Sequence, residues 1–300
     1  MKKQIVILIF TIFLGINGVQ AQQIPHYTQY MFNNYVINPA LAGTHNYYQI
    51  KSNHRFQWVG INDPPLTNTL SIFGPYKTTD MGFGGYLYSD VTGPSSRMGL
   101  NGSYAYNIAI SDDIRLSMGI SIGLIQYKID GTQITLKDPT DMTLLESIYS
   151  AYVPDASLGL YLYSSNFFVG FSATQLISNK LKLYEIKSGL SKLKSHFYLT
   201  GGYKYFINRD LAIEPSLMLK GTSPVFIQLD INTKVIYQNR AWLGLSFRTQ
   251  DAISILMGYM HENKIYFGYS YDFSISNIRK YNSGSHEIMI GYKFNIIPGR

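Results

Sequence analysis

The sequence predicts an all-β fold, a transmembrane antiparallel up-and-down β-barrel of about 14 strands with periplasmic N- and C-termini. Three observations lead to this prediction. Long segments alternate between bulky apolar and small or polar residues, the composition is rich in tyrosine and poor in charge, and short turns alternate with longer loops. A soluble β-sandwich is the alternative, but its strands should be shorter and its outer faces should carry more charge.

The clearest alternation lies between Met98 and Leu124, on both sides of a polar break at 111–113. Each of the two runs lasts about a dozen residues, roughly twice the length of an ordinary soluble strand. One bulky apolar face and one small or polar face suit a wall with lipid on one side and a polar lumen on the other. The bulky residues are Met98, Leu100, Tyr104, Tyr106, Ile108 and Ile110, then Ile114, Leu116, Met118, Ile120, Ile122 and Leu124.

The composition favours strands and excludes thiol chemistry. Of 300 residues, 46% are hydrophobic, 15% aromatic and only 14% charged, and tyrosine and glycine occur 26 times each. Tyrosine suits strands and membrane interfaces, whereas helix-rich proteins favour alanine, leucine, glutamate and lysine. Because the chain has no cysteine, disulfide bracing, thiolate catalysis and a lipid anchor on cysteine are excluded.

Residues 1–21 are predicted to be a cleaved signal peptide. Lys2 and Lys3 supply the positive start, Ile5 to Leu14 the apolar segment, and Val19-Gln20-Ala21 the small-residue pattern for cleavage. A transmembrane anchor is the alternative, but the apolar run is too short to span a bilayer. Loss of the two lysines lowers the formal charge from +7 to +5, and the scattered positive residues do not suggest nucleic-acid binding. We therefore expect a mature chain in the cell outer membrane, with a periplasmic N-terminal arm at 22–44 and a barrel at 45–300.

The alternation divides the barrel into its expected strands. Connections at one end are short turns, and those at the other end include the longer segments 129–154 and 178–193, which is the usual asymmetry between periplasmic and outer ends. Pro215 falls within a strand, where we expect a bulge because proline lacks a ladder donor. An apolar segment of the longest loop, from Met142 to Ile148, is a candidate to fold over the mouth or into the lumen. The expected strands are 46–59, 66–76, 80–90, 97–110, 114–128, 155–163, 166–177, 194–207, 210–221, 225–237, 240–248, 251–261, 264–274 and 285–297.

No motif for catalysis, cofactor binding or metal binding stands out, so we expect no enzyme and no cofactor. His286 and Glu287 are adjacent, but neighbours along a strand point to opposite faces, so this pair is expected to be structural. Charges of both signs fall on the lumen-facing parity, where they usually pair with one another and close the interior. These residues are Arg115, Lys204, Glu214, Lys220, Asp230, Lys234, Arg248, Asp272, Glu287 and Lys293.

Several short motifs in order resemble the PorP/SprF family, outer-membrane proteins of Bacteroidetes linked to type IX secretion and gliding. The motifs are residues 27–33 (YTQYMFN), 37–43 (INPALAG), 55–60 (RFQWVG), 154–159 (PDASLG), 269–272 (YSYD) and 284–288 (GSHEI). The resemblance runs over nearly the whole mature length. The signature positions are Arg55, Gln57, Trp58, Asp272, Gly284, His286 and Glu287.

The resemblance implies a non-enzymatic barrel that acts with type IX secretion components, as partner for export or surface anchoring of a large adhesin-like secreted protein. A channel for small solutes is the alternative. Exposed aromatic residues on the arm would suit a partner interface, although the arm could equally pack into the barrel mouth as a plug. The proposed partner-binding residues are Tyr27, Gln29, Tyr30, Phe32, Asn38, Pro39 and Gly43.

Overall fold

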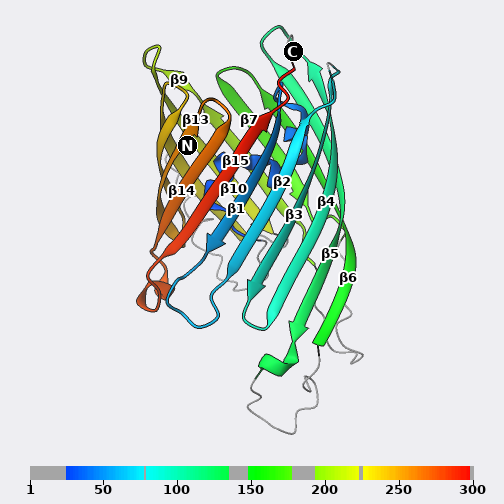
Figure 1. Cartoon of the computed structure of the whole chain (residues 1–300), viewed down its shortest axis with the longest axis vertical. Coiled ribbons are helices and arrows are strands. Elements are labelled where there is room, and N and C mark those ends of the chain that lie inside the picture. Colours follow the sequence, from blue (N-terminus) through cyan, green and yellow to red (C-terminus); the bar gives the residue numbers. More distant parts are fainter. Residues whose placement is uncertain (1–24, 78, 135–147, 178–192, 223–225, 298–300) are drawn as a thin grey trace, which may run out of the picture.

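The computed structural model describes residues 25–77, 79–134, 148–177, 193–222 and 226–297. Within these ranges, fifteen strands form one antiparallel sheet, and the pairing of the first strand, β1, with the last, β15, closes it into a barrel (Figure 1). The strands β8 and β9 are two segments of one barrel strand, because both pair with β10 in the same register. The barrel therefore has fourteen strands in sequence order, which confirms the predicted fold.

The strand bounds follow the predicted alternation closely. They are β1 (Tyr48–Phe56), β2 (Leu66–Pro75), β3 (Met81–Thr92), β4 (Ser95–Ala109), β5 (Arg115–Asp130), β6 (Ile148–Tyr163), β7 (Phe167–Thr174), β8 (His196–Tyr203), β9 (Tyr205–Phe206), β10 (Leu211–Thr222), β11 (Phe226–Tyr237), β12 (Ala241–Arg248), β13 (Ala252–His261), β14 (Ile265–Ser274) and β15 (Ser285–Phe294).

Two details of the prediction are wrong. The sixth strand begins at Ile148 rather than at 155, because Pro154 continues the strand and pairs with Leu124. Pro215 causes no bulge: β10 keeps one register on both sides of it, and the neighbouring strand is interrupted instead, between β8 and β9. Most of the apolar segment that begins at Met142 lies outside the described residues.

The side chains alternate between an apolar outer face and a polar interior. On the outer face, Leu100 is 64% exposed and Ile122 is 71% exposed, whereas the intervening Asn101 and Ser121 are buried inside. This arrangement follows from the period of two in a strand, and it confirms that the bulky parity of the hairpin faces outward.

The two ends of the barrel differ in their connections. At one end, here called the short-turn end, strands are joined by brief turns such as 110–114 and 262–264. Tyr48 pairs with Phe294, so the chain enters the first strand and leaves the last one at this end. The opposite end, here called the long-loop end, carries the connections that follow β5, β7 and β14 (Figure 1).

The arm, residues 25–44, lies inside the barrel (Figure 1). It folds into three short 3-10 helices, η1 (Thr28–Met31), η2 (Asn34–Val36) and η3 (Pro39–Gly43). Two further 3-10 helices, η4 (Gly131–Gln133) and η6 (Asn277–Lys280), lie in loops at the long-loop end. Within the described residues, no helix is both long and apolar enough to cross a membrane.

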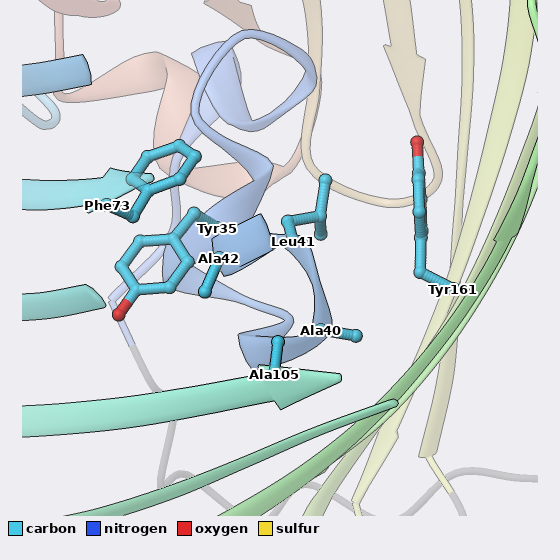
Figure 2. Close-up of a cluster of buried hydrophobic side chains, with 7 residues drawn as sticks. All are labelled: Tyr35, Ala40, Leu41, Ala42, Phe73, Ala105 and Tyr161. Carbon is cyan, nitrogen blue, oxygen red and sulfur yellow. The ribbon is translucent and has the colours of Figure 1, made fainter. Parts of the chain in front are cut away.

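The core of the molecule lies between η2, η3 and the inner wall. Tyr35 stacks on Phe73 with ring centroids 4.3 Å apart, beside the buried helix η3 (Figure 2). Glycines in the wall allow the arm to approach closely: a Cβ on Gly82 would lie 2.3 Å from the Cα of Gly43. A side chain at such a position would displace the arm. The buried cluster comprises Tyr35, Ala40, Leu41, Ala42, Phe73, Ala105 and Tyr161.

Candidate functional site

A buried network of charges fixes the start of the arm near the long-loop end of the barrel. Its wall residues sit on the inward parity of neighbouring strands. Arg55 on β1 is the direct cross-strand partner of Glu287 on β15, and Asp230 on β11 is that of Arg248 on β12. All four side chains are at most 2% exposed. Opposite charges therefore face one another across two strand pairs inside the barrel.

Thr28 of the arm is placed between these wall charges. Its hydroxyl donates to the Asp272 carboxylate at 2.8 Å and accepts from Arg55 Nη1 at 2.7 Å. Its backbone N–H donates to Glu287 Oε2 at 2.7 Å. The guanidinium of Arg55 also binds Asp272 directly, Nη2 to Oδ2, at 2.7 Å. One arm residue thus joins the charged groups of three strands.

The network continues along the wall from this point. Arg248 donates from Nη1 to Asp251 at 2.8 Å, and its Nε lies 3.5 Å from the Asp230 carboxylate. Lys220 Nζ lies 3.5 Å from the same Asp230 carboxylate and 3.2 Å from His26 Nδ1 of the arm. Burial, followed by the charge of Lys220, lowers the pKa of His26 well below its usual value. The imidazole of His26 is therefore neutral at pH 7 and accepts a hydrogen bond from Lys220.

Such a network is a strong and specific anchor, because removing any one of its groups lowers the stability of the folded state. Removing one partner from a buried ion pair leaves an uncompensated charge and destabilises the folded state by about 3–5 kcal/mol. Most of the lumen-facing charges thus pair as predicted: Lys234 lies 2.8 Å from Glu214, and Arg248 contacts three carboxylates, whereas Lys204 and Lys293 have no ion pair among the described residues.

The seven proposed partner-binding residues all contact the inner wall. Tyr27 Oη lies 2.7 Å from Thr69 Oγ1, and Gln29 donates to the Glu287 carbonyl at 2.8 Å. The prediction of exposed aromatic residues outside the wall is wrong: Tyr30 is 6% exposed, Tyr35 is 1% exposed, and Phe32 packs on Trp242 at 4.7 Å between ring centroids. Hydrophobic burial in the lumen accounts for this placement.

The end of the arm is fixed near the short-turn end. The Asn38 side chain accepts from the Ala40 N–H at 3.0 Å, which caps η3, and donates to the Leu160 carbonyl at 3.1 Å. Pro39 occupies the first turn of η3, where its missing N–H is harmless. Gly43 lies against Gly82 of the wall. The arm therefore runs through the lumen from the long-loop half to the short-turn end.

The seven signature positions separate into three groups. Arg55, Asp272 and Glu287 form the buried network, which the sequence could not reveal because only the closed barrel brings their strands together. Gln57 and Trp58 follow β1: Gln57 donates its backbone N–H to the Pro65 carbonyl at 2.9 Å, and Trp58 donates its own to Ser285 Oγ at 3.0 Å.

Gly284 directly precedes β15 and His286 is its second residue, so both lie opposite the segment that holds Gln57 and Trp58. Gly284 has a φ of +95°, which favours glycine, and its carbonyl accepts from the Val59 N–H at 2.8 Å. His286 points away from the lumen, with Nδ1 2.7 Å from Tyr269 Oη, whereas Glu287 is buried inside. The predicted divergence of this adjacent pair is confirmed.

Two residues of the site escaped sequence reasoning. Thr28 carried no signal, because a threonine in an irregular segment is unremarkable in type. Lys51 lies on the inward parity of β1 together with Gln49 and Asn53. The outward parity of this strand includes Ser52 and His54, so its alternation was weak.

Among the described residues, no group of histidine, aspartate or glutamate side chains could hold a metal ion.

A closed wall with an apolar outer band, a polar interior and short turns at one end defines an outer-membrane β-barrel. The family model of the type IX secretion system membrane protein PorP/SprF matches residues 19–292. The chain belongs to this family.

One solved structure supports the barrel architecture. The chain is similar to the CymD monoaromatic hydrocarbon channel, at 13% identity and a TM-score of 0.53, over 94% of this chain and 96% of that one. A Pseudomonas aeruginosa FadL homologue matches at 11% identity and a TM-score of 0.47, over 90% of this chain and 94% of that one. At 13% identity, the likeness to the CymD channel shows the fold alone. No curated protein matches the chain in sequence.

Proposed function

We propose that this chain is a non-enzymatic barrel of the cell outer membrane that serves type IX secretion as a dedicated partner for export or surface anchoring of a large secreted protein. Membership in the PorP/SprF family supports the link to the secretion machinery. Short turns face the periplasm in most bacterial barrels, so the short-turn end, where the chain enters β1 and leaves β15, is assigned to the periplasmic side.

The observation that carries this proposal is the arm in the lumen. Its aromatic residues fill the interior next to the wall, and Thr28 ties it to the charges of three strands. A barrel filled by its own chain is suited to hold and present a partner, whereas a diffusion channel needs an open path. We assign partner contact to the short-turn end, where Met31, Phe32 and Asn34 of the arm line an open chamber.

The test removes the arm from the chain. Deletion of residues 26–43 should lower secretion or surface display of the large protein encoded beside this one, measured in cell-surface and medium fractions. Insertion of the shortened barrel is checked by its heat-modifiable migration on gels. Unchanged secretion by a correctly inserted deletion variant would reject the role of the arm.

A channel for small solutes is the second candidate, because a chamber of about 440 Å³ lies within the barrel and reaches the rim of the short-turn end. Conductance in planar bilayers separates the two functions. The full chain should give no steady open steps, while the variant that lacks residues 26–43 should conduct. Steady conductance by the full chain would favour the channel and count against the proposed function.

A further inference from the structure

The chamber at the short-turn end lies between the arm and the wall. Its lining includes Phe32 of the arm, the strand residues Lys51 and Tyr266, and the exposed β6–β7 turn at 164–166. Because this turn belongs to the rim, the chamber communicates with the space beyond the short-turn end. Its volume of about 440 Å³ falls within the range of about 300–1,000 Å³ that is typical of ligand pockets.

Lys51 reaches this chamber as a buried lysine that has no carboxylate partner among the described residues. It is 6% exposed, and among the described residues no carboxylate lies within ion-pair distance of its ammonium group. Its Nζ donates to the Phe32 carbonyl and lies 5.7 Å from the ring centroid of Phe73 and 5.6 Å from that of Tyr266. Carbonyl and ring contacts stabilise the ammonium group, but they do not neutralise its charge.

Two other unpaired lysines belong to this region: Lys204 lines the chamber, and Lys293 lies behind the rings of Tyr47 and Tyr266, which line it. Lys293 neighbours Gln49 in the strand register, and its Nζ lies 4.6 Å from the ring centroid of Tyr47 and 4.9 Å from that of Tyr266. Lys204 has Asn239 as its hydrogen-bond partner, at 3.1 Å. These two lysines, like Lys51, have no ion pair among the described residues.

Few carboxylates lie near these lysines to neutralise them. Among the described residues, Glu214 is the one carboxylate in the chamber lining, and it already binds Lys234 at 2.8 Å. Lys234 also approaches the Phe32 ring, at 4.9 Å from its centroid. Lys51 and Lys234 therefore contact the same arm residue from β1 and β11. Like charges gathered in a partly enclosed space raise the local positive potential and attract anions.

We propose that this chamber binds an acidic polypeptide segment, which enters from the short-turn end and places its carboxylates against Lys51, Lys204 and Lys293. The lysines come from different parts of the wall, so a ligand with several carboxylates can reach more of them than a single small anion can. Tyrosine and phenylalanine rings between the lysines supply contact area for a peptide backbone and its side chains.

The assignment of this segment to the exported protein rests on the proposed function, whereas the binding site does not. A synthetic peptide therefore tests the site alone, and the secretion assay with the arm deletion tests the function alone. Failure of one leaves the other standing.

The binding test uses the full chain in an uncharged detergent and in nanodiscs of zwitterionic lipid. The probes are a dye-labelled peptide rich in glutamate and its twin with glutamine in place of every glutamate, and the readout is fluorescence anisotropy. We expect the acidic peptide to bind at least about tenfold more tightly than the twin, with weaker binding at high salt because added ions screen the lysines. Equal affinity for the two peptides would overturn the proposal.

Lysine variants locate the binding. Lys51→Gln, Lys204→Gln and Lys293→Gln should each weaken binding several-fold, whereas Lys264→Gln, at an exposed turn of the same end, should leave it unchanged. Lys204 and Lys293 are half-buried, so these variants keep the test valid if Lys51→Gln fails to fold. An equal loss in Lys264→Gln would show non-specific attraction and overturn the site. Displacement of the peptide by an equimolar amount of glutarate would identify a small-anion site and overturn the polypeptide assignment.

Discussion

The backbone N–H of Thr28 donates to the carboxylate of Glu287 at 2.7 Å, which joins residues 259 positions apart in the chain. Glu287 lies on the last strand, and its cross-strand partner Arg55 lies on the first. The arm is therefore anchored at the seam where the first and last strands meet. Its contacts to both strands are complete only in the closed barrel.

The first prediction concerns the burial of the arm. Because the chain has no cysteine, a single Ala40→Cys substitution provides a reporter at a position that is 0% exposed. In the folded barrel this thiol should react with a bulky water-soluble maleimide at least about tenfold more slowly than one in the exposed β4–β5 turn, from Asp112→Cys, because reaction requires local opening. Equal rates would show that the arm does not occupy the lumen.

The second prediction concerns Arg55. Replacement by Met leaves Asp272 and Glu287 buried with less compensation, so docking of the arm should weaken by about 3–5 kcal/mol. The matched control is Arg115→Met, because Arg115 forms an ion pair of 2.5 Å with Asp80 where both side chains are partly exposed, at 32% and 51%. Exposed pairs contribute about 0–1 kcal/mol. The reactivity of the residue 40 thiol measures both variants, and similar effects would contradict the proposed anchor.

The third prediction isolates the hydroxyl of Thr28. Thr28→Val keeps the shape of the side chain but leaves Asp272 without one donor and Arg55 without one acceptor, at a loss of about 1–3 kcal/mol. Thr28→Ser retains the hydroxyl and should behave close to the parent. Thermal unfolding of the arm, followed through the same thiol, distinguishes them. A valine variant as stable as the serine variant would show that the hydroxyl of Thr28 does not contribute to the network.

The fourth prediction concerns the close approach between the arm and the wall. In Gly82→Ala the new methyl group would lie 2.3 Å from the Cα of Gly43, so the arm must shift, at about 1–3 kcal/mol. Gly102→Ala is the control, because nothing lies within 4 Å of its added methyl group. Faster labelling of the residue 40 thiol in the first variant alone is the expected result. Equal labelling rates in the two variants would show that Gly43 does not lie against Gly82.

The fifth prediction concerns pH. The lowered pKa of His26 keeps its imidazole neutral in the docked arm, while an undocked arm titrates near the ordinary value of about 6.5. As the pH falls below about 6.5, the imidazole of His26 takes up a proton in the undocked state but stays neutral in the docked state. Docking of the arm therefore weakens by up to about 1.4 kcal/mol per pH unit.

The measurement compares labelling of the residue 40 thiol with that of the exposed residue 112 thiol at each pH, which removes the pH dependence of the thiol itself. The relative rate should rise between pH 7 and pH 5. His26→Gln retains an acceptor for Lys220 and should flatten this rise. The same slope in both proteins would assign the effect to other groups.

The sequence alone determined the barrel. Alternation at Met98 to Leu124 and in later segments specified long strands, their inward and outward faces and the difference between the two ends, because the period of two is a local property of the chain. It also identified the charges of the lumen, most of which pair with one another. The prediction was wrong about where the sixth strand begins, at Ile148, and about which strand is interrupted near Pro215.

Only the tertiary structure decided where the arm lies and what holds it. Residues 25–44 have no periodicity that points to a face, so their aromatic residues could equally suit an outer interface or the lumen. Closure of the barrel brings Arg55, Asp272 and Glu287 together from strands distant in the chain, and Gly82 opens the space that Gly43 occupies. These are contacts between residues far apart in sequence, and no local pattern encodes their distance.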